Sequence, residues 1–434
     1  MKRLAFTNAR LLDPASELDV PGALLVENGL IREVGPRLFH DAPPGDAELV
    51  DCKGRALAPG LIDMRVFTGE PGSEHRETLE SAGRAAAAGG VTTMVVMPNT
   101  EPVIDEPSLV EFVRRRAAAT ACVRVLPMAA LTHGLQGEAM TEMGLLIEAG
   151  AVGFTDGDRT IADAGVMRRA LAYASTFGAL VAGHAEEPAL VKGAAMNEGE
   201  FATRLGVPSA PAAAEAIIVE RDIRLMELTG VRYHLGQIST RAALEAVIAA
   251  RSRGLSISCA VSAHHLALNE FDVGSYLTFR KVKPPLRSEE DRVAMVEGVA
   301  DGTIDVIVSS HDPQAADTKR QTFAQAAFGA VGLETLLPVS LQLHHNGQAG
   351  LLRVLGALTD RPARVLQLDS GRLARGLAAD LVIFDSDEPF AVDPGKLHSR
   401  ARNTPFEGRT FQGRVYRTYV DGVCVFDRAM DQPA

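Results

Sequence analysis

The chain has 434 residues, a formal net charge of −11 and 46% hydrophobic residues, and it contains no apolar run long enough to span a membrane. That length exceeds one average domain and allows a large buried core, while the acidic balance argues against a nucleic-acid partner or an anionic membrane surface. The four cysteines stand far apart without a C-x-x-C pair, which predicts buried, reduced thiols in a cytoplasmic protein.

Both ends of the chain show short alternating patterns that are typical of antiparallel strands. Near the N-terminus, two apolar runs, 23–26 and 30–34, are separated by Asn28-Gly29, which is a strong hairpin signal. Strand-and-turn patterns also follow one another near the C-terminus. We therefore predict one small β-sandwich domain built from residues 1–57 and 366–434.

Residues 58–365 show a different pattern, in which short apolar runs alternate with segments of helical length. The predicted strands cover 61–67, 91–97, 123–128, 151–155, 180–184, 231–235, 256–261 and 304–308. This number and spacing of strands predict an α/β fold of the parallel (β/α)8 TIM-barrel class. In such a barrel, functional side chains follow the carboxyl ends of the strands.

The first barrel strand opens into a Gly/Pro-rich loop and is the stretch around which the remaining motifs are arranged. Strict alternation along residues 61–67 places Asp63, Arg65 and Phe67 on one face of the strand. Met64 and Val66 are then expected on the opposite face.

Motifs distributed along the chain resemble those of the dihydroorotases, a family of cyclic amidohydrolases. Pro59–Met64 and Glu70-Pro71-Gly72 flank the place where that family carries an H-x-H pair. Further landmarks are Met97–Thr100, Gly153–Asp156, His184–Pro188, Ser262–Leu266, Pro284–Arg287 and Phe328–Glu334. Their order and spacing extend the resemblance over nearly the whole chain. It implies an amidohydrolase barrel that opens or closes a cyclic amide with zinc-activated water.

The resemblance assigns six positions to metal binding or acid–base chemistry, and four of them are substituted. The substituted positions are Arg65 and Phe67 at the histidine pair, Gln237 at a later imidazole ligand and Ser310 at the catalytic aspartate. Asp156 and His184 remain as vestigial ligands. Because a catalytic zinc normally keeps three protein ligands, we expect no metal and no other cofactor. We also predict that Arg65 fills the vacated cation position and pairs with Asp156.

The positions that the resemblance assigns to the substrate have changed as well. Gly69 replaces an arginine, Lys283 an asparagine and Gln314 a histidine, whereas Asn99 is retained. The residues expected to line a substrate pocket are Asn99, His264, Lys283, His311 and Gln314.

Neighbouring side chains leave two alternatives open. A shifted metal site would combine His184, Asp156 and Asp312, whereas His234 is expected to be a core histidine on the other side of its strand. A barrel that binds a small molecule without turnover would use Asn99, His184, His264 and Lys283.

The main prediction is a non-catalytic dihydroorotase-like homologue, a pseudoenzyme, in pyrimidine biosynthesis. The resemblance implies aspartate carbamoyltransferase as its partner in a multi-subunit assembly, and a homo-oligomeric chain. The alternative is an active zinc-dependent dihydroorotase, or a cyclic amidase for another ring such as a hydantoin, with a rebuilt metal site.

Overall fold

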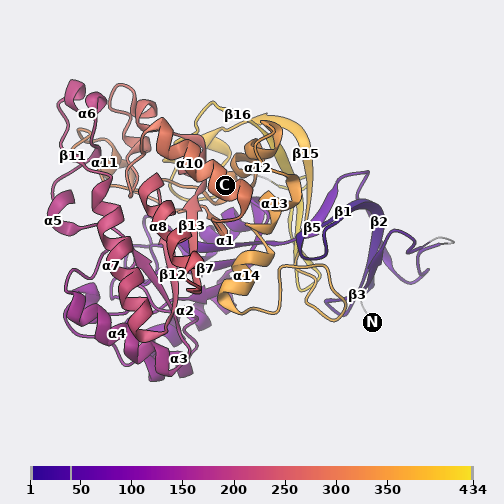
Figure 1. Ribbon diagram of the computed structural model, residues 1–434. Helices are drawn as coiled ribbons and strands as arrows, with labels where there is room; N and C mark the ends of the chain where they lie inside the picture. Colours follow the sequence, from indigo (N-terminus) through magenta and orange to yellow (C-terminus); the bar gives the residue numbers. More distant parts are fainter. Residues whose placement is uncertain (1–2, 40–41, 432–434) are drawn as a thin grey trace.

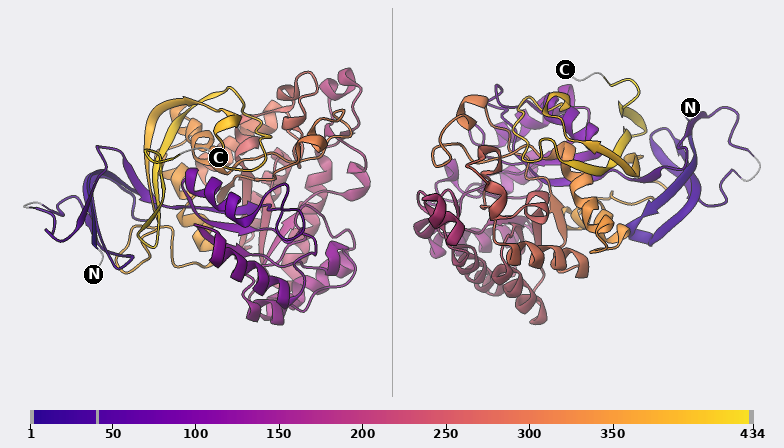
Figure 2. Two further views of the ribbon diagram at one scale, coloured as in Figure 1. Left: turned by 180° about the vertical axis from the view of Figure 1, so that it is seen from behind. Right: turned by 90° about the horizontal axis from the view of Figure 1, so that it is seen from above.

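The computed structural model describes residues 3–39 and 42–431. Figures 1 and 2 show a barrel wrapped by helices and, beside it, a sheet that combines the two ends of the chain. The predicted composite domain begins at residue 1 and ends at residue 434, and these two boundaries lie outside the described residues.

The sheet has eight strands in the order β17-β16-β15-β5-β1-β2-β3, with β4 beside β1. Their bounds are β1 Arg3–Asp13, β2 Leu18–Glu27, β3 Leu30–Gly35, β4 Glu48–Asp51, β5 Ala56–Pro59, β15 Leu381–Ala391, β16 Thr410–Val420 and β17 Val423–Asp427. The predicted hairpin joins β2 to β3, and Asn28 and Gly29 both have the positive φ that its tight turn requires. The two ends of the chain meet where β5 pairs antiparallel with β15.

The barrel strands confirm the predicted TIM-barrel class. Their bounds are β6 Leu61–Val66, β7 Val91–Val96, β8 Arg124–Pro127, β9 Leu180–His184, β12 Arg232–Gln237, β13 Ile257–Ser262 and β14 Val306–Val308. They form two parallel ladders, β6-β7-β8 and β9-β12-β13-β14.

One predicted strand, 151–155, is reduced to a single bridging residue. Phe154 bridges Ala129 on one side and Val181 on the other, so it joins the two ladders at the fourth position of the barrel. A bridge between Val66 and His311 closes the opposite seam. The barrel is therefore complete although its fourth strand is irregular.

The helices cover the outside of the barrel, as Figure 1 shows. Their bounds are α1 Leu79–Ala88, α2 Pro107–Thr120, α3 Met143–Ala149, α4 Ala164–Thr176, α5 Pro188–Val191, α6 Glu200–Leu205, α7 Ala213–Thr229, α8 Arg241–Ser252, α9 Ala263–Ala267, α10 Glu289–Asp301, α11 Ala316–Lys319, α12 Leu336–His345, α13 Leu351–Gly356 and α14 Asp360–Leu366. Two short strands, β10 Met196–Asn197 and β11 Ser209–Ala210, form a separate ladder. In the described part of the chain, no helix has the length and apolar character needed to cross a membrane.

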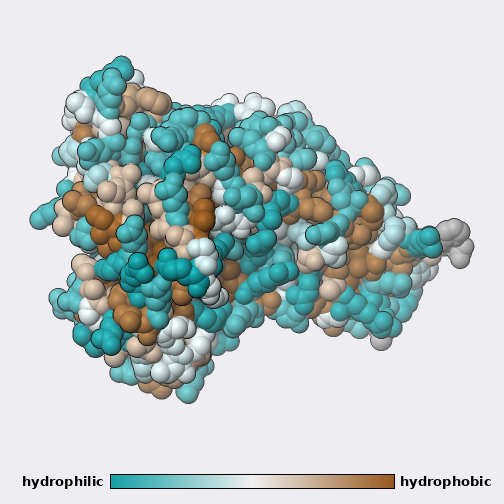
Figure 3. All heavy atoms as spheres, in the orientation of Figure 1, coloured by the Kyte–Doolittle hydropathy of each residue, from teal (hydrophilic) through white to brown (hydrophobic). Residues whose placement is uncertain are grey.

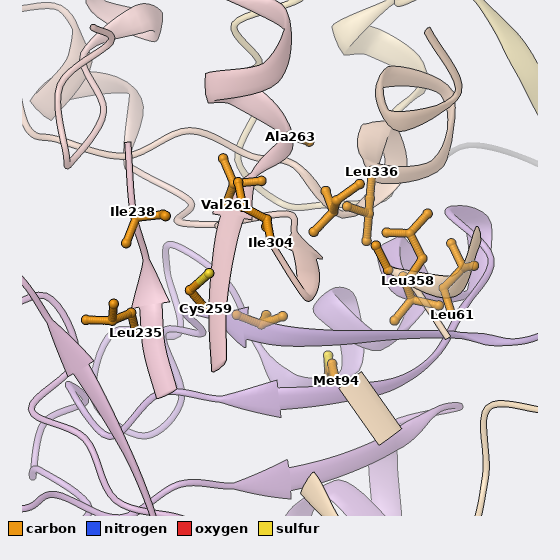
Figure 4. Close-up of a cluster of buried hydrophobic side chains, with 14 of the residues drawn as sticks. Leu61, Met94, Leu235, Ile238, Cys259, Val261, Ala263, Ile304, Leu336 and Leu358 are labelled. Atoms are coloured by element: carbon orange, nitrogen blue, oxygen red, sulfur yellow. The ribbon is translucent and has the colours of Figure 1, made fainter. Parts of the chain in front are cut away.

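Two apolar cores hold the barrel. The outer core lies between strands and helices and includes Leu235 and Cys259 (Figure 4). The inner core fills the barrel with side chains such as Ile62, Val95 and Met128. On the surface in Figure 3, hydrophobic residues are interspersed among hydrophilic ones.

The cysteines are free, but only two of them are buried as expected. Cys52 and Cys259 are buried, Cys122 is half-buried, and Cys424 is exposed on the edge strand β17.

His398 ties the C-terminal segment to the barrel. Its Nδ1 lies 2.9 Å from Glu334 Oε2 and its Nε2 lies 2.8 Å from Asp431 Oδ1. The hydrogen bond and charge of Glu334, with a further contribution from Asp431, raise the pKa of His398 to about 9 although burial opposes the shift. The charged ring thus bridges two carboxylates.

This bridge predicts a pH-dependent stability. The pKa of His398 is higher in the folded chain than the value of about 6.5 in an unfolded chain, so its contribution is full below that pH and is lost as the pH rises through about 9. Relative to a His398→Gln variant, the wild-type free energy of unfolding in urea should fall by about 1–2 kcal/mol between pH 6 and pH 9.5, after allowance for solvent screening. Other titrating groups are common to both proteins and cancel in the difference. A difference that does not change with pH would contradict the assignment.

Candidate functional site

The first barrel strand does not keep the expected alternation. The register of β6 against β7 shifts between Asp63 and Val66. Met64 and Phe67 both belong to the inner core, whereas Val66 packs in the outer core. The prediction that Met64 and Val66 share one face, opposite Phe67, is therefore wrong, because an irregularity in the ladder reverses the side-chain alternation partway along the strand.

Arg65 fills the carboxyl end of the barrel with a buried cation. The residue is 3% exposed, and its Nη2 donates a hydrogen bond of 3.1 Å to the carbonyl of Gly157. Its guanidinium carbon lies 5.1 Å from the centre of the Phe67 ring. At Gly236, a Cβ atom would lie 3.4 Å from Arg65 Nη1, so this glycine lines the guanidinium closely. Arg65 Nε is buried and has no hydrogen-bond partner among the described residues.

The electrostatic surroundings of Arg65 are those of a desolvated cation near several carboxylates. Burial lowers the pKa of Arg65, and the charges of Asp158, Asp312 and Asp63 oppose that shift. A guanidinium nevertheless stays protonated in proteins. The end of the barrel therefore carries a fixed positive charge.

Asp156 does not form the predicted ion pair with Arg65. Its Oδ1 accepts the amide hydrogens of Leu131 and Thr132 at 2.9 Å each, and its Oδ2 accepts the hydroxyl of Thr132. Burial raises the pKa of Asp156, although these hydrogen bonds oppose the shift. The prediction failed because the carboxylate is turned into the loop after β8, where three donors already satisfy it.

His184 is paired with a carboxylate that the motif analysis overlooked. His184 Nε2 lies 3.4 Å from Glu186 Oε2, and Lys283 Nζ lies 3.3 Å from the same oxygen. Burial opposes ionisation of Glu186, yet His184 and Lys283 together hold its pKa at about 2. Burial also lowers the pKa of His184. The available signal was the position of Glu186, two residues beyond a barrel strand end.

Ser310 and Gln237, two of the four substituted positions, are joined by a neutral hydrogen bond. Ser310 donates from Oγ to Gln237 Oε1 at 3.1 Å, and Gln237 Nε2 lies 3.2 Å from His265 Nδ1. His265 Nε2 lies 3.2 Å from the carbonyl of Pro285. Both the oxygen and the nitrogen of the Gln237 side-chain amide are therefore engaged in hydrogen bonds.

Of the predicted pocket residues, Asn99 and Lys283 lie near the Gly157 loop. A Cβ atom on Gly157 would lie 3.0 Å from Asn99 Oδ1, and that oxygen is buried without a partner in the described part of the chain. Lys283 Nζ donates to the carbonyl of Asp158 at 2.9 Å. These two side chains flank the loop that Arg65 also contacts.

The other three predicted pocket residues make contacts with surrounding segments. His311 Nε2 lies 3.5 Å from Glu77 Oε2, and Gln314 Nε2 donates to Asp312 Oδ1 at 2.8 Å. The ring of His264 lies 5.7 Å from that of Phe406, and burial lowers the pKa of His264 to about 3. The structure therefore does not join all five residues into one hydrogen-bonded pocket.

Neither His234 nor the shifted set of His184, Asp156 and Asp312 forms a rebuilt metal site. His234 is buried, as expected for a core residue, and its Nδ1 lies 2.8 Å from Ser258 Oγ. In the proposed shifted set, Asp156 is bound to Thr132, and Asp312 accepts hydrogen bonds from Arg76 and Gln314. Within residues 3–39 and 42–431, no group of three or more His, Cys, Asp or Glu side chains is placed to hold a metal ion. The inherited zinc positions thus do not fit the ion.

A closed parallel barrel with a sheet from both chain ends is shared with solved structures of other proteins. The L-hydantoinase of Arthrobacter aurescens superposes with a TM-score of 0.88 at 23% identity, covering 99% of this chain and 97% of that one. The dihydropyrimidinase of Brevibacillus agri gives a TM-score of 0.86 at 20% identity, with coverages of 98% and 95%. These similarities establish the fold.

Sequence comparison identifies the family within that class. The model of the dihydro-orotase-like family matches residues 54–243. The chain is 44% identical to the dihydroorotase of Anaplasma phagocytophilum over 98% of this chain and 95% of that protein. It is 43% identical to the dihydroorotase of Anaeromyxobacter sp. strain K, with 98% of both chains covered. The chain belongs to the dihydroorotase family.

These comparisons correct one expectation. The prediction of no cofactor is wrong, because relatives at 44% identity are named dihydroorotases and the family points to a metal cofactor, zinc. The prediction equated altered ligand positions with loss of the metal. A zinc site in this chain would need ligands other than the substituted positions Arg65, Phe67, Gln237 and Ser310.

The contacts of Asp156 predict a structural role for this carboxylate. An Asp156→Ala variant would leave two amides and the Thr132 hydroxyl without an acceptor, so urea unfolding should show a loss of about 2–3 kcal/mol. A Thr132→Val variant, which removes only the hydroxyl, should lose less. The loss in the Asp156 variant should be equal in zinc and in EDTA. A loss seen only in zinc would show that Asp156 is a metal ligand.

Proposed function

We propose that this dihydroorotase-family chain serves de novo pyrimidine biosynthesis as a non-catalytic homologue that supports the assembly of aspartate carbamoyltransferase. The observation that carries the proposal is the Arg65 guanidinium, buried at the end of the barrel and hydrogen-bonded to Gly157. It occupies the position at which the family resemblance places the first of two histidines.

The chemistry of the site supports the loss of the inherited reaction. Hydrolysis of a cyclic amide at neutral pH needs a group that lowers the pKa of water and polarises the carbonyl. A fixed guanidinium cannot accept the proton of water, and its charge repels a divalent cation nearby. The amide of Gln237 and the hydroxyl of Ser310 are weak acceptors for a proton, and they are hydrogen-bonded to each other.

The partner and the assembly rest on the family resemblance. A barrel kept for its shape would retain its core and the sheet that joins the chain ends, and both are intact here. A homo-oligomeric, cytoplasmic protein belongs to the same proposal.

The first test measures ring opening of dihydroorotate beside metal content. The wild type should give no turnover above background, including at saturating zinc, because Arg65 and Phe67 leave the inherited site without imidazoles. The matched variant is Arg65→His, Phe67→His, Gln237→His and Ser310→Asp, made together in the same chain. It should bind more zinc than the wild type. Zinc-dependent turnover by the wild type would overturn the proposal.

The second test concerns the partner. The purified chain, mixed with aspartate carbamoyltransferase of the same organism, should elute from a sizing column as one larger species. An Arg65→Met variant should behave in the same way, since the proposal assigns assembly to the surface and not to the barrel end. Clean separation of the two wild-type proteins would contradict the proposal.

A second candidate is a zinc-dependent dihydroorotase or another cyclic amidase with a rebuilt site. The identity of 44% to dihydroorotases over 98% of the chain favours it. It predicts stoichiometric zinc and ring opening of dihydroorotate or a hydantoin, with both abolished by Glu186→Gln or His184→Ala if that buried pair supplies ligands. The same measurements therefore separate the two candidates.

A further inference from the structure

A cavity of about 220 Å³ lies beside the Glu186–Lys283 pair. Lys281, Lys283 and Glu186 provide its charged groups, while Val191, Met196 and Phe328 are among its apolar lining residues. The volume lies below the range of about 300–1,000 Å³ that is common for drug-sized ligands, and it suits a small organic molecule.

Lys281 is a buried cation without an anion. It is 3% exposed, and it forms no ion pair with any residue in the described ranges. Its Nζ donates to the carbonyls of Ala324 and Ala326, at 2.9 Å and 2.7 Å, and lies 4.4 Å from the centre of the Phe328 ring. An ammonium has three donors, so one N–H remains after these two bonds.

The charged residues that line the cavity leave an excess of one positive charge. Lys283 Nζ lies 3.3 Å from Glu186 Oε2, so these two opposite charges form an ion pair. Burial lowers the pKa of Lys281 to about 8, which is the expected response of an ammonium held away from water without a counter-charge. A second buried ammonium, Lys319 Nζ, donates to three carbonyls, including that of Lys281 at 3.4 Å, and brings no negative charge.

We infer that this cavity is a binding site for a small organic monocarboxylate with an apolar body. The carboxylate would accept the remaining hydrogen of Lys281 and supply the missing negative charge. The apolar part would lie against Val191, Met196 and Phe328. The inference goes beyond the proposed function, because it requires neither hydrolysis nor a partner protein.

Phosphate is a poorer match than a carboxylate for this lining. It carries more negative charge at neutral pH than the single excess positive charge, and it needs several donors at once. The apolar lining residues would give it no partners. A monocarboxylate satisfies both the charge and the apolar lining.

The test compares three ligands of one shape on the full-length wild-type chain. Isovalerate, its neutral amide isovaleramide and the cation 3-methylbutylamine are added at equal concentration and ionic strength. Isovalerate should raise the melting temperature and give measurable heat of binding, whereas the amide, the amine and inorganic phosphate should not. Stabilisation by the amide or by phosphate equal to that by isovalerate would overturn the inference, as would no effect of isovalerate.

Two variants locate the site. Lys281→Met should weaken isovalerate binding at least tenfold, because the uncompensated charge is removed while the length of the side chain is largely kept. The control is Lys192→Met, which removes an exposed charge next to the cavity-lining Val191 and Gly193 and should leave binding unchanged. Equal binding by wild type and Lys281→Met would refute the assignment. If the Lys281 variant does not fold, the ligand comparison on the wild type still decides the question.

Discussion

The buried guanidinium of Arg65 determines the electrostatics at the carboxyl end of the barrel. The guanidinium of Arg65 is held by the Gly157 carbonyl and lined by Phe67 and Gly236. Burying such a charge is unfavourable unless nearby groups compensate it. The negative charges of Asp158, Asp312 and Asp63 favour the charged form of Arg65. The guanidinium therefore supplies a permanent positive charge at this end of the barrel.

The other polar groups at this end have been redirected to structural contacts. Asp156 fixes the loop that follows β8, Asp312 accepts hydrogen bonds from Arg76 and Gln314, and Gln237 bonds Ser310. Each contact satisfies a group that would otherwise be buried without a partner. The comparisons nevertheless place the chain firmly among proteins named dihydroorotases. Family membership follows from the sequence, whereas activity depends on the side chains of the site itself.

The sequence was sufficient for the architecture because the signals for strands and turns were local and repeated. The apolar runs that predicted eight barrel strands occur as strands in all but the fourth, where Phe154 alone bridges its neighbours. The direction of Asp156 was not predictable in this way, since it depends on Thr132 and Leu131 in a loop formed by another part of the chain. The faces of Met64 and Val66 were misjudged for a related reason, because a register shift in β6 is not visible in the pattern of residues. Local periodicity was therefore enough to predict the strands, whereas the hydrogen bonds of the site residues depend on contacts between distant loops.

The pairing of β5 with β15 has a consequence for biogenesis. Residues 56–59 leave the ribosome long before residues 381–384 are made. Until then, strand β5 at the edge of the amino-terminal part of the sheet has no partner strand on that side. The barrel segments between them can collapse first and bring the two halves within reach, which lowers the entropy of that late closure. A nascent chain arrested shortly before β15 would therefore present an unpaired strand beside a nearly complete barrel, and that intermediate is where chaperone contact or misassociation would concentrate.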